Sequence, residues 1–171
     1  ELDLVNFFWD KNDEYIIFLT CCFEIFKINV KSKEIIKIFS SKENIYINDV
    51  NEENHIIISL YSSKRMLIID LSGNLIKVIE PYGGLADDGE ILANFQFSPN
   101  YRFIAFRSFP FNLLKLYHIK KDKTFIIYIL NWDFFDKFTW SPDSKKLYFI
   151  QKDKSGNYCL YELKIPERIL K

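Results

Sequence analysis

The sequence predicts an all-β protein built from about four copies of a four-stranded antiparallel sheet. The prediction depends on three observations: a repeated apolar anchor, a repeated order of short strand-like runs, and the lack of a convincing helical period. The 171-residue chain is 49% hydrophobic and 18% aromatic, with only 5 Gly and 5 Pro. This composition is typical of a globular core and excludes a disordered chain.

Each repeat begins with an apolar anchor, followed by about five polar turn residues and a hydrophobic run. The anchors are Trp9, Val50, Phe97 and Trp140, which lie 41, 47 and 43 residues apart. The seventh residue after each anchor is apolar: Ile16, Ile57, Ile104 and Leu147. Apolar–polar–apolar triplets centred on Asn29, Asp70, His118 and Glu162 follow with nearly the same spacing. A four-stranded unit with this period is typical of a β-propeller blade.

The second repeat shows the expected strands in order. Its runs are 45–50, 56–60, 65–71 and 75–79, and polar residues separate them. The first run partly alternates, and the second is continuously apolar, as in a strand that is covered on both faces. The same division predicts blades at 1–40, 45–80, 90–131 and 135–171. Residues 165–171 could add a last strand, although Pro166 is unfavourable within a central strand.

An open arc of four blades would expose apolar surface on its first and last sheets. We therefore favour a segment of a larger propeller, or an arc that another chain completes, over a closed four-bladed ring or another all-β arrangement. The expected partners are the remaining propeller blades, a second copy of the chain or another protein.

The segment Trp140-Ser141-Pro142-Asp143-Ser144-Lys145 resembles the W-S-P-D-G-K box of TolB-type propellers, and Phe97-Ser98-Pro99-Asn100 is a weaker copy. Similar boxes occur in prolyl oligopeptidase and dipeptidyl peptidase propellers. The stretch from Asp70 to Glu90 also resembles a blade junction of NHL-like propellers, whereas WD repeats fit less well. The resemblance implies a TolB-type propeller. Pro fixes φ and Ser and Asp bind turn backbone, so we interpret the box residues as structural.

Three loops carry candidate binding residues. The insertion 81–90 contains Tyr82, Asp87, Asp88 and Glu90, and we interpret it as a solvated connection or a binding loop. Its carboxylates could ligate Ca²⁺, but the spaced ligands of an EF-hand are absent, so no metal is expected. Phe109 and Phe111 lie in a turn between the second and third strands of their repeat. Trp132 and Asp133 precede an inner strand, where Trp132 could stack on a sugar, contact a protein or pack onto its own blade.

The charge and motif content argue against several functions. With 23 basic and 23 acidic residues the formal charge is zero, which disfavours nucleic-acid binding. No apolar run is long enough to span a membrane. No nucleophile elbow, zinc-protease motif or phosphate-binding loop is present, and His55 and His118 occupy repeat positions that are polar elsewhere. Cys21, Cys22 and Cys159 are expected to be free thiols, or to include one long-range bridge. We expect no enzyme activity and no cofactor.

Three functional hypotheses follow. The first is a non-catalytic binding or scaffold module, and the second is the propeller portion of a peptidase or hydrolase whose catalytic domain lies outside these residues. The third is a carbohydrate-binding propeller. The TolB-type resemblance weakly favours a location outside the cytoplasm.

Overall fold

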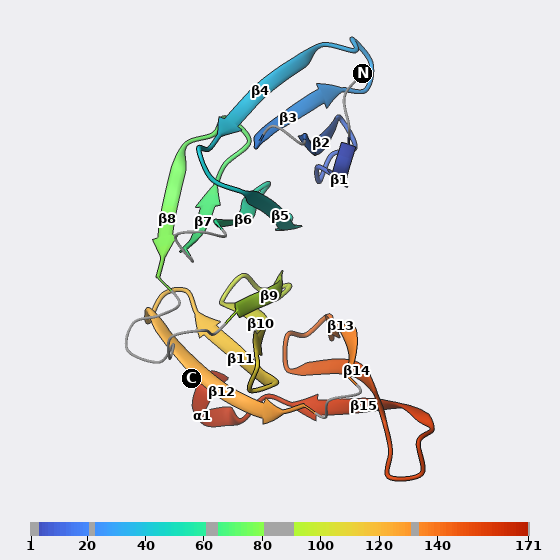
Figure 1. Cartoon of the computed structure of the whole chain (residues 1–171). Helices are drawn as coiled ribbons and strands as arrows, with labels where there is room; N and C mark the ends of the chain where they lie inside the picture. The colour runs from blue at the N-terminus through green and yellow to red at the C-terminus, as the bar shows by residue number, and fades with distance from the viewer. Residues whose placement is uncertain (1–3, 21–22, 61–64, 81–90, 131–133, 171) are drawn as a thin grey trace. The chain divides into compact units, whose positions relative to one another are not determined.

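The computed structural model describes residues 4–20, 23–60, 65–80, 91–130 and 134–170. These residues form fifteen strands and one short helix (Figure 1). The strands are β1 (Leu4–Trp9), β2 (Tyr15–Thr20), β3 (Glu24–Asn29), β4 (Ile35–Ser40), β5 (Ile45–Val50), β6 (Ile56–Leu60), β7 (Arg65–Ile69), β8 (Leu75–Ile79), β9 (Ile91–Phe97), β10 (Phe103–Phe109), β11 (Leu113–His118), β12 (Lys123–Ile129), β13 (Phe134–Trp140), β14 (Lys146–Lys152) and β15 (Tyr158–Lys164).

The strands form four antiparallel sheets, each with its strands side by side in chain order. The sheets β1–β4, β5–β8 and β9–β12 have four strands, and the described part of the last sheet has three, β13–β15. The predicted all-β class and repeated sheet are therefore confirmed. After β15 the chain forms the helix α1 (Glu167–Leu170) in place of a fourth strand. Pro166 accepts the first hydrogen bond of this turn, from the Ile169 N–H at 2.8 Å.

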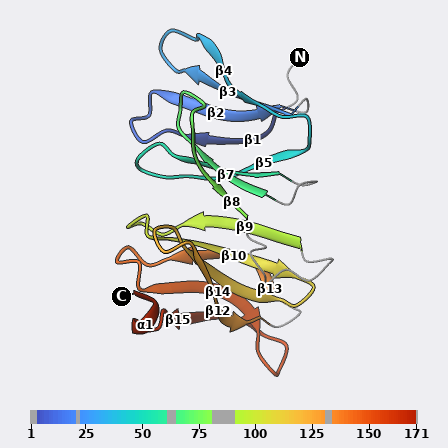
Figure 2. The same cartoon turned by 90° about the vertical axis from the view of Figure 1, so that its left-hand side faces the viewer.

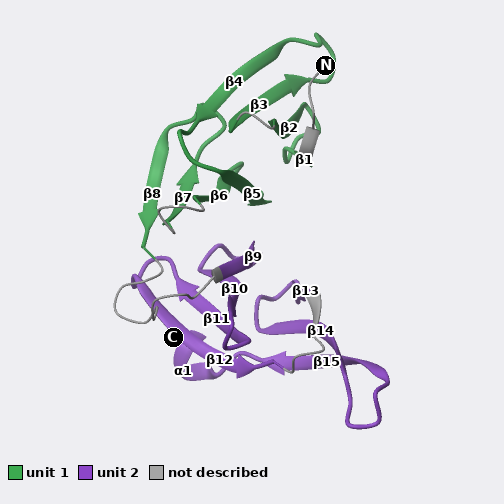
Figure 3. Cartoon of the chain, in the orientation of Figure 1, with its two compact units in different colours: residues 1–86 green, residues 87–171 purple. Residues whose placement is uncertain are grey.

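The chain divides into two compact units, residues 1–86 and 87–171 (Figure 3). Each contains two sheets and has its own hydrophobic core. In the first unit, the order of the strands β1 to β4 can be followed in Figure 2. Its core is formed by Ile17, Leu19, Ile25, Ile38, Ile45, Ile47, Ile56, Ile58, Leu67 and Ile69.

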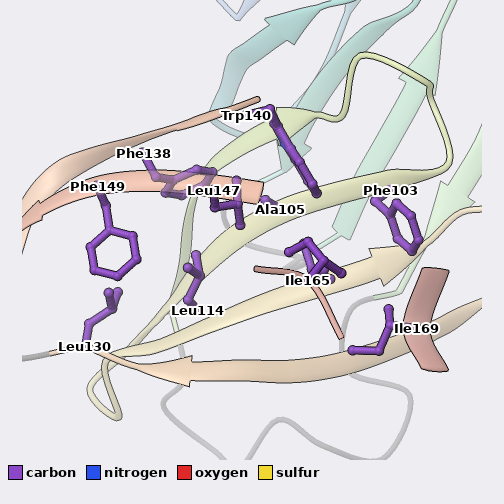
Figure 4. Close-up of a cluster of buried hydrophobic side chains, with 11 residues drawn as sticks. Phe103, Ala105, Leu114, Leu130, Phe138, Trp140, Leu147, Phe149, Ile165 and Ile169 are labelled. Atoms are coloured by element: carbon purple, nitrogen blue, oxygen red, sulfur yellow. The ribbon is translucent and has the colours of Figure 1, made fainter. Parts of the chain in front are cut away.

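The core of the second unit lies between the sheets β9–β12 and β13–β15 (Figure 4). It contains Phe103, Ala105, Leu114, Leu116, Leu130, Phe138, Trp140, Leu147, Phe149, Ile165 and Ile169. The rings of Phe103 and Trp140 stack with centroids 6.4 Å apart, so the predicted anchor Trp140 fills the space between two sheets. Its indole N–H also donates to the Gln96 carbonyl at 3.4 Å.

The turn after each anchor has one recurring hydrogen-bond pattern. In the two box-like repeats, the Oγ atoms of Ser98 and Ser141 accept the N–H groups of Phe103 at 3.0 Å and Lys146 at 2.9 Å. The Ser141 hydroxyl donates to the Asp143 carboxylate at 2.6 Å, and this bond lowers the pKa of Asp143. These serines are buried, as their structural role requires.

The first two repeats preserve this pattern with different residues. Asp10 Oδ1 accepts the Tyr15 N–H at 2.7 Å, and Asn51 Oδ1 accepts the His55 N–H at 2.8 Å. The similarity of the first two repeats to the box-like repeats therefore extends beyond the apolar anchor. A short side chain with an acceptor oxygen, whether Ser, Asp or Asn, is the shared requirement.

The structure shows one irregularity in the register of the repeats and corrects one predicted equivalence. In the second repeat the turn is one residue shorter, because Asn51 bonds to His55, whereas Asp10 bonds to Tyr15. Val50 therefore pairs with Ile56, whereas each of the other three anchors pairs with the seventh residue after it. The run Ile56–Ile58 is uniformly apolar, so the residue types do not indicate which of these residues pairs with Val50.

The correction concerns the triplet assigned to the fourth repeat. Glu162 lies opposite Tyr148 inside the sheet, and the residue that corresponds to His118 is Lys164. The next residue shows the equivalence, because the Ile165 N–H donates to the Lys145 carbonyl at 2.8 Å, as the Ile119 N–H does to Arg102 at 2.9 Å.

Neighbouring turns within a unit are also bonded to each other. In the first unit, the Lys11 N–H donates to Asn54 Oδ1 at 2.9 Å. In the second, the Asn100 N–H donates to Ser144 Oγ at 3.0 Å. Asn54 and Ser144 both follow their anchors by four residues and both have a positive φ, of 60° and 59°. The two units therefore join their sheets in the same way.

Candidate functional site: the Phe109–Asn112 turn

Of the predicted binding residues, Phe109 and Phe111 lie in the described part of the chain. Tyr82, Asp87, Asp88, Glu90, Trp132 and Asp133 lie outside the described residues, so their proposed roles stay predictions. The described candidate site is therefore the turn between β10 and β11, where the sequence analysis had placed these two aromatic residues.

The chain reverses its direction over the four residues Phe109, Pro110, Phe111 and Asn112. The Phe109–Pro110 peptide bond is cis, and Asn112 has a φ of 51°, in the region that Asn tolerates better than most residues. The backbone carbonyl of Asn112 accepts the Leu130 N–H at 2.7 Å. This bond ties the turn to the residue that follows β12.

Arg107 lies in β10, the strand that leads into the turn, and contacts residues at both ends of the turn. Its Nη2 donates to Asn112 Oδ1 at 2.8 Å, and its guanidinium lies 3.8 Å from the centroid of the Phe109 ring. Arg107 and Asn112 are both buried. Because a buried cation must be compensated, the bond to Asn112 and the contact with the ring fix the shape of this turn.

Sequence reasoning missed Arg107, although one signal was available. It follows Phe103-Ile104-Ala105-Phe106 and is the single charged residue of this strand. A charge in such a run indicates either an exposed edge or a buried interaction with a specific partner. The partner, Asn112, lies in a turn whose conformation the sequence did not reveal.

The two predicted aromatic residues have different surroundings. Phe109 is half-buried under the Arg107 guanidinium, so its ring supports the turn. Phe111 is 49% exposed. The turn therefore presents one accessible aromatic ring on a backbone that buried polar groups hold in place. Such a ring can bury a large apolar area against a ligand at a low cost in side-chain entropy.

The equivalent hairpin turn in the next sheet connects β14 to β15. Asp153 Oδ1 accepts the N–H groups of Ser155 at 2.8 Å and Asn157 at 3.0 Å. The bond from Asn157 is the main reason why the pKa of Asp153 is lowered. Cys159 is a free thiol, and burial together with Asp153 raises its pKa. A thiol with a raised pKa is a weak nucleophile at neutral pH.

The two histidines lie beside turns, and His55 Nδ1 is 3.5 Å from Glu53 Oε2. His118 is buried, its Nδ1 accepts the Lys121 N–H at 3.3 Å, and its ring lies 4.9 Å from that of Phe103. Burial lowers the pKa of His118, and Lys121 adds to the effect. Asn29 and Asp70 accept turn N–H groups at the equivalent position. These contacts give His118 a structural role as the cap of its turn.

Within the described ranges, no group of three or more His, Cys, Asp or Glu residues is arranged to hold a metal ion. None of the described helices is long and apolar enough to cross a membrane. The calcium hypothesis concerned Asp87, Asp88 and Glu90, which are not among the described residues.

Comparison with proteins of known structure shows which fold the chain has. No protein-family model matches the sequence, and no curated protein matches it. Solved structures do match. A structure of TolB from Agrobacterium tumefaciens aligns with 95% of this chain at a TM-score of 0.68 and 11% identity. The crystal structure of the tricorn protease aligns with 93% of it at a TM-score of 0.65 and 16% identity.

The chain has a TolB-type β-propeller-like fold. It spans 58% of the TolB chain and 17% of the tricorn protease chain. At these identities the likeness concerns the fold alone. The resemblance of the Trp140–Lys145 box to TolB-type repeats is thereby confirmed at the level of the fold.

Proposed function

We propose that the chain is a non-catalytic propeller module that binds a protein or another ligand through the Phe109–Asn112 turn and the loops at the same end of its sheets. The observation that carries the proposal is the exposed Phe111 ring on a turn held by the buried Arg107–Asn112 hydrogen bond. An aromatic group on a fixed support loses little conformational entropy on binding.

The topology of the second unit supports this location. The turn between β10 and β11 and the turn between β14 and β15 are equivalent hairpins of neighbouring sheets, so they lie at the same end of these sheets. The opposite end carries the anchor turns, whose polar side chains bond to their own backbone. Loops supported by a rigid scaffold are common recognition surfaces.

Site-specific photocrosslinking tests the proposal. Benzoylphenylalanine would replace Phe111 in one variant and Ile126 in another, and each variant would be irradiated in an extract of the source cells. Ile126 is a matched control because it is 53% exposed but lies on the outer strand β12. We expect a discrete crosslinked species from position 111 only. The same species from both positions, or none from position 111, would contradict the proposal.

A second candidate is the propeller portion of a peptidase or hydrolase. It is favoured by the likeness to the tricorn protease, which extends over 93% of this chain. An antibody against the chain would measure the size of the natural polypeptide. A larger polypeptide that reacts with a serine-directed hydrolase probe would support this candidate, and a natural product of 20.5 kDa would contradict it.

A further inference from the structure

Two sheet faces of this chain expose large apolar side chains at positions most of which are buried in its other sheets. The first, the Trp9 face, is the side of the β1–β4 sheet that carries Phe7 and Trp9. The second, the Leu160 face, is the side of the β13–β15 sheet that carries Ile150, Tyr158 and Leu160. We propose that the Trp9 face of one copy of the chain packs against the Leu160 face of a second copy.

The Trp9 face points away from the core of its own unit. Phe7 pairs with Phe18 and Trp9 pairs with Ile16, whereas the intervening residues Phe8 and Ile17 contact the core. Phe7 is 62% exposed and Trp9 is 48% exposed. Adjacent residues of a strand point to opposite sides, so this sheet has one face covered by β5–β8 and one apolar face exposed.

The second unit shows what covers such a face. There Trp140 pairs with Leu147 and Phe138 with Phe149, just as Trp9 pairs with Ile16 and Phe7 with Phe18. Phe138 and Trp140 are both buried against the sheet β9–β12. Trp140 also donates its indole N–H to the Gln96 carbonyl, whereas the Trp9 indole makes no hydrogen bond within the described part of the chain. The Trp9 face therefore matches the side of a blade that packs onto a preceding blade.

The Leu160 face has the complementary character. Leu160 occupies the position in its sheet that Leu114 and Ile25 occupy in theirs. Leu160 pairs with Ile150, Leu114 pairs with Arg107, and Ile25 pairs with Leu19. Leu114 and Ile25 are completely buried under the next sheet, but Leu160 is 71% exposed. At Leu160 this face therefore matches the surface on which a Trp140-type face packs. Lys146, which forms an ion pair with Glu162 at 2.9 Å, occupies the position at which Phe103 stacks on Trp140.

The chain therefore exposes one face of each kind, and each can cover the other when they come from different copies. The stacking between the copies would continue the interface that each unit already contains. The five side chains offer roughly 500 Å² of exposed apolar area, if large side chains bury about 150–250 Å² each. This would form the centre of an interface of the usual total size of about 1,200–2,000 Å², of which slightly more than half is apolar. The formal charge of zero adds no long-range repulsion between copies.

This contact joins two different surfaces, so it predicts a specific mixing behaviour. Phe7→Lys removes the Trp9 face but leaves the Leu160 face intact, and Leu160→Lys does the reverse. We expect light scattering coupled to size exclusion at 100 µM to give at least twice the 20.5 kDa chain mass for the wild type and 20.5 kDa for each variant alone. A 1:1 mixture of the variants should form a heterodimer and stop there.

Ile129→Lys is the matched control, because Ile129 is 70% exposed but belongs to neither face. It should associate as the wild type does. Circular dichroism checks that every variant keeps its strand content. A wild-type chain that stays monomeric at 100 µM would overturn the proposal, and so would a mixture of the two variants that stays monomeric. Association of Leu160→Lys to the wild-type mass would also overturn it, because another surface would then be responsible.

Discussion

Gly73, between β7 and β8, and Gly156, between β14 and β15, lie in turns of the same type, and only Gly73 lies against other backbone. Both belong to the sequence Asp-x-Ser-Gly-Asn, and both have a φ of 83°. In each turn the Asp carboxylate accepts the N–H groups two and four residues later. A Cβ on Gly73 would lie 1.9 Å from the Ile38 carbonyl oxygen, whereas a Cβ on Gly156 would meet nothing within 4 Å.

Replacing each glycine by alanine separates two contributions to the loss of stability, the strain of a left-handed backbone and a steric overlap with Ile38. Gly156→Ala introduces only the strain of a left-handed residue, about 1–2 kcal/mol, partly offset by the lower entropy of the unfolded chain. Gly73→Ala adds a backbone overlap that can be relieved only by moving β4 or the turn by about 1 Å. Overpacking of this kind costs about 1–3 kcal/mol. We expect Gly73→Ala to lower the free energy of unfolding by about 1–3 kcal/mol more than Gly156→Ala does.

The two glycines lie in different compact units, so the assay must report each unit separately. Urea-dependent hydrogen exchange, measured by mass spectrometry on peptides from β4 and β7 and from β14 and β15, meets this need. With a urea dependence of about 1–2 kcal/mol per molar, the expected loss in the first unit shifts its midpoint by about 1 M or more. Equal losses for the two variants would refute the close approach of Gly73 to Ile38.

Three further predictions concern buried polar groups in the second unit. Arg107→Met leaves the Asn112 amide oxygen without its donor, so we expect a loss of about 2–3 kcal/mol in urea unfolding, and a loss below 0.5 kcal/mol would contradict this role. Ser141→Ala removes the acceptor of the Lys146 N–H and should cost about 1 kcal/mol by the same assay, whereas an unchanged midpoint would show that the hydroxyl is dispensable. The pKa of His118 is lowered by burial, so the unfolded chain binds a proton more readily, and stability should fall as the pH drops below the ordinary value of 6.5. Replacement by Asn, the residue at the equivalent position 29, should flatten this dependence between pH 8 and pH 5, and parallel profiles for the two proteins would argue against it.

The repeat could be predicted from the sequence because its determinants are local. An anchor such as Trp140, a turn that begins with Ser141 and a following apolar run all lie within a dozen residues. The irregular pairing in the second repeat and the misassigned triplet in the fourth both occur where the local pattern fits two registers. Ile56 and Ile57 are both apolar, and Tyr161-Glu162-Leu163 and Leu163-Lys164-Ile165 both fit an apolar–polar–apolar triplet.

The candidate site was predicted only in part for a different reason. Phe109 and Phe111 were found because aromatic residues beside Pro in a turn are conspicuous. The role of Arg107 depends on the conformation of the turn at Asn112, five residues away, and on the burial that the neighbouring sheet provides. Both are tertiary properties, so neither the spacing nor the composition could indicate them.

The bonds from Lys11 to Asn54 and from Asn100 to Ser144 bear on how such a chain can be re-engineered or can gain and lose repeats. Each donor is a backbone N–H that any residue but proline supplies, while each acceptor is a side chain of the following repeat. If the second or the fourth repeat is removed alone, the backbone N–H of the repeat before it loses its acceptor. Grafting experiments should therefore move adjacent repeats together, with the joint placed between the two units.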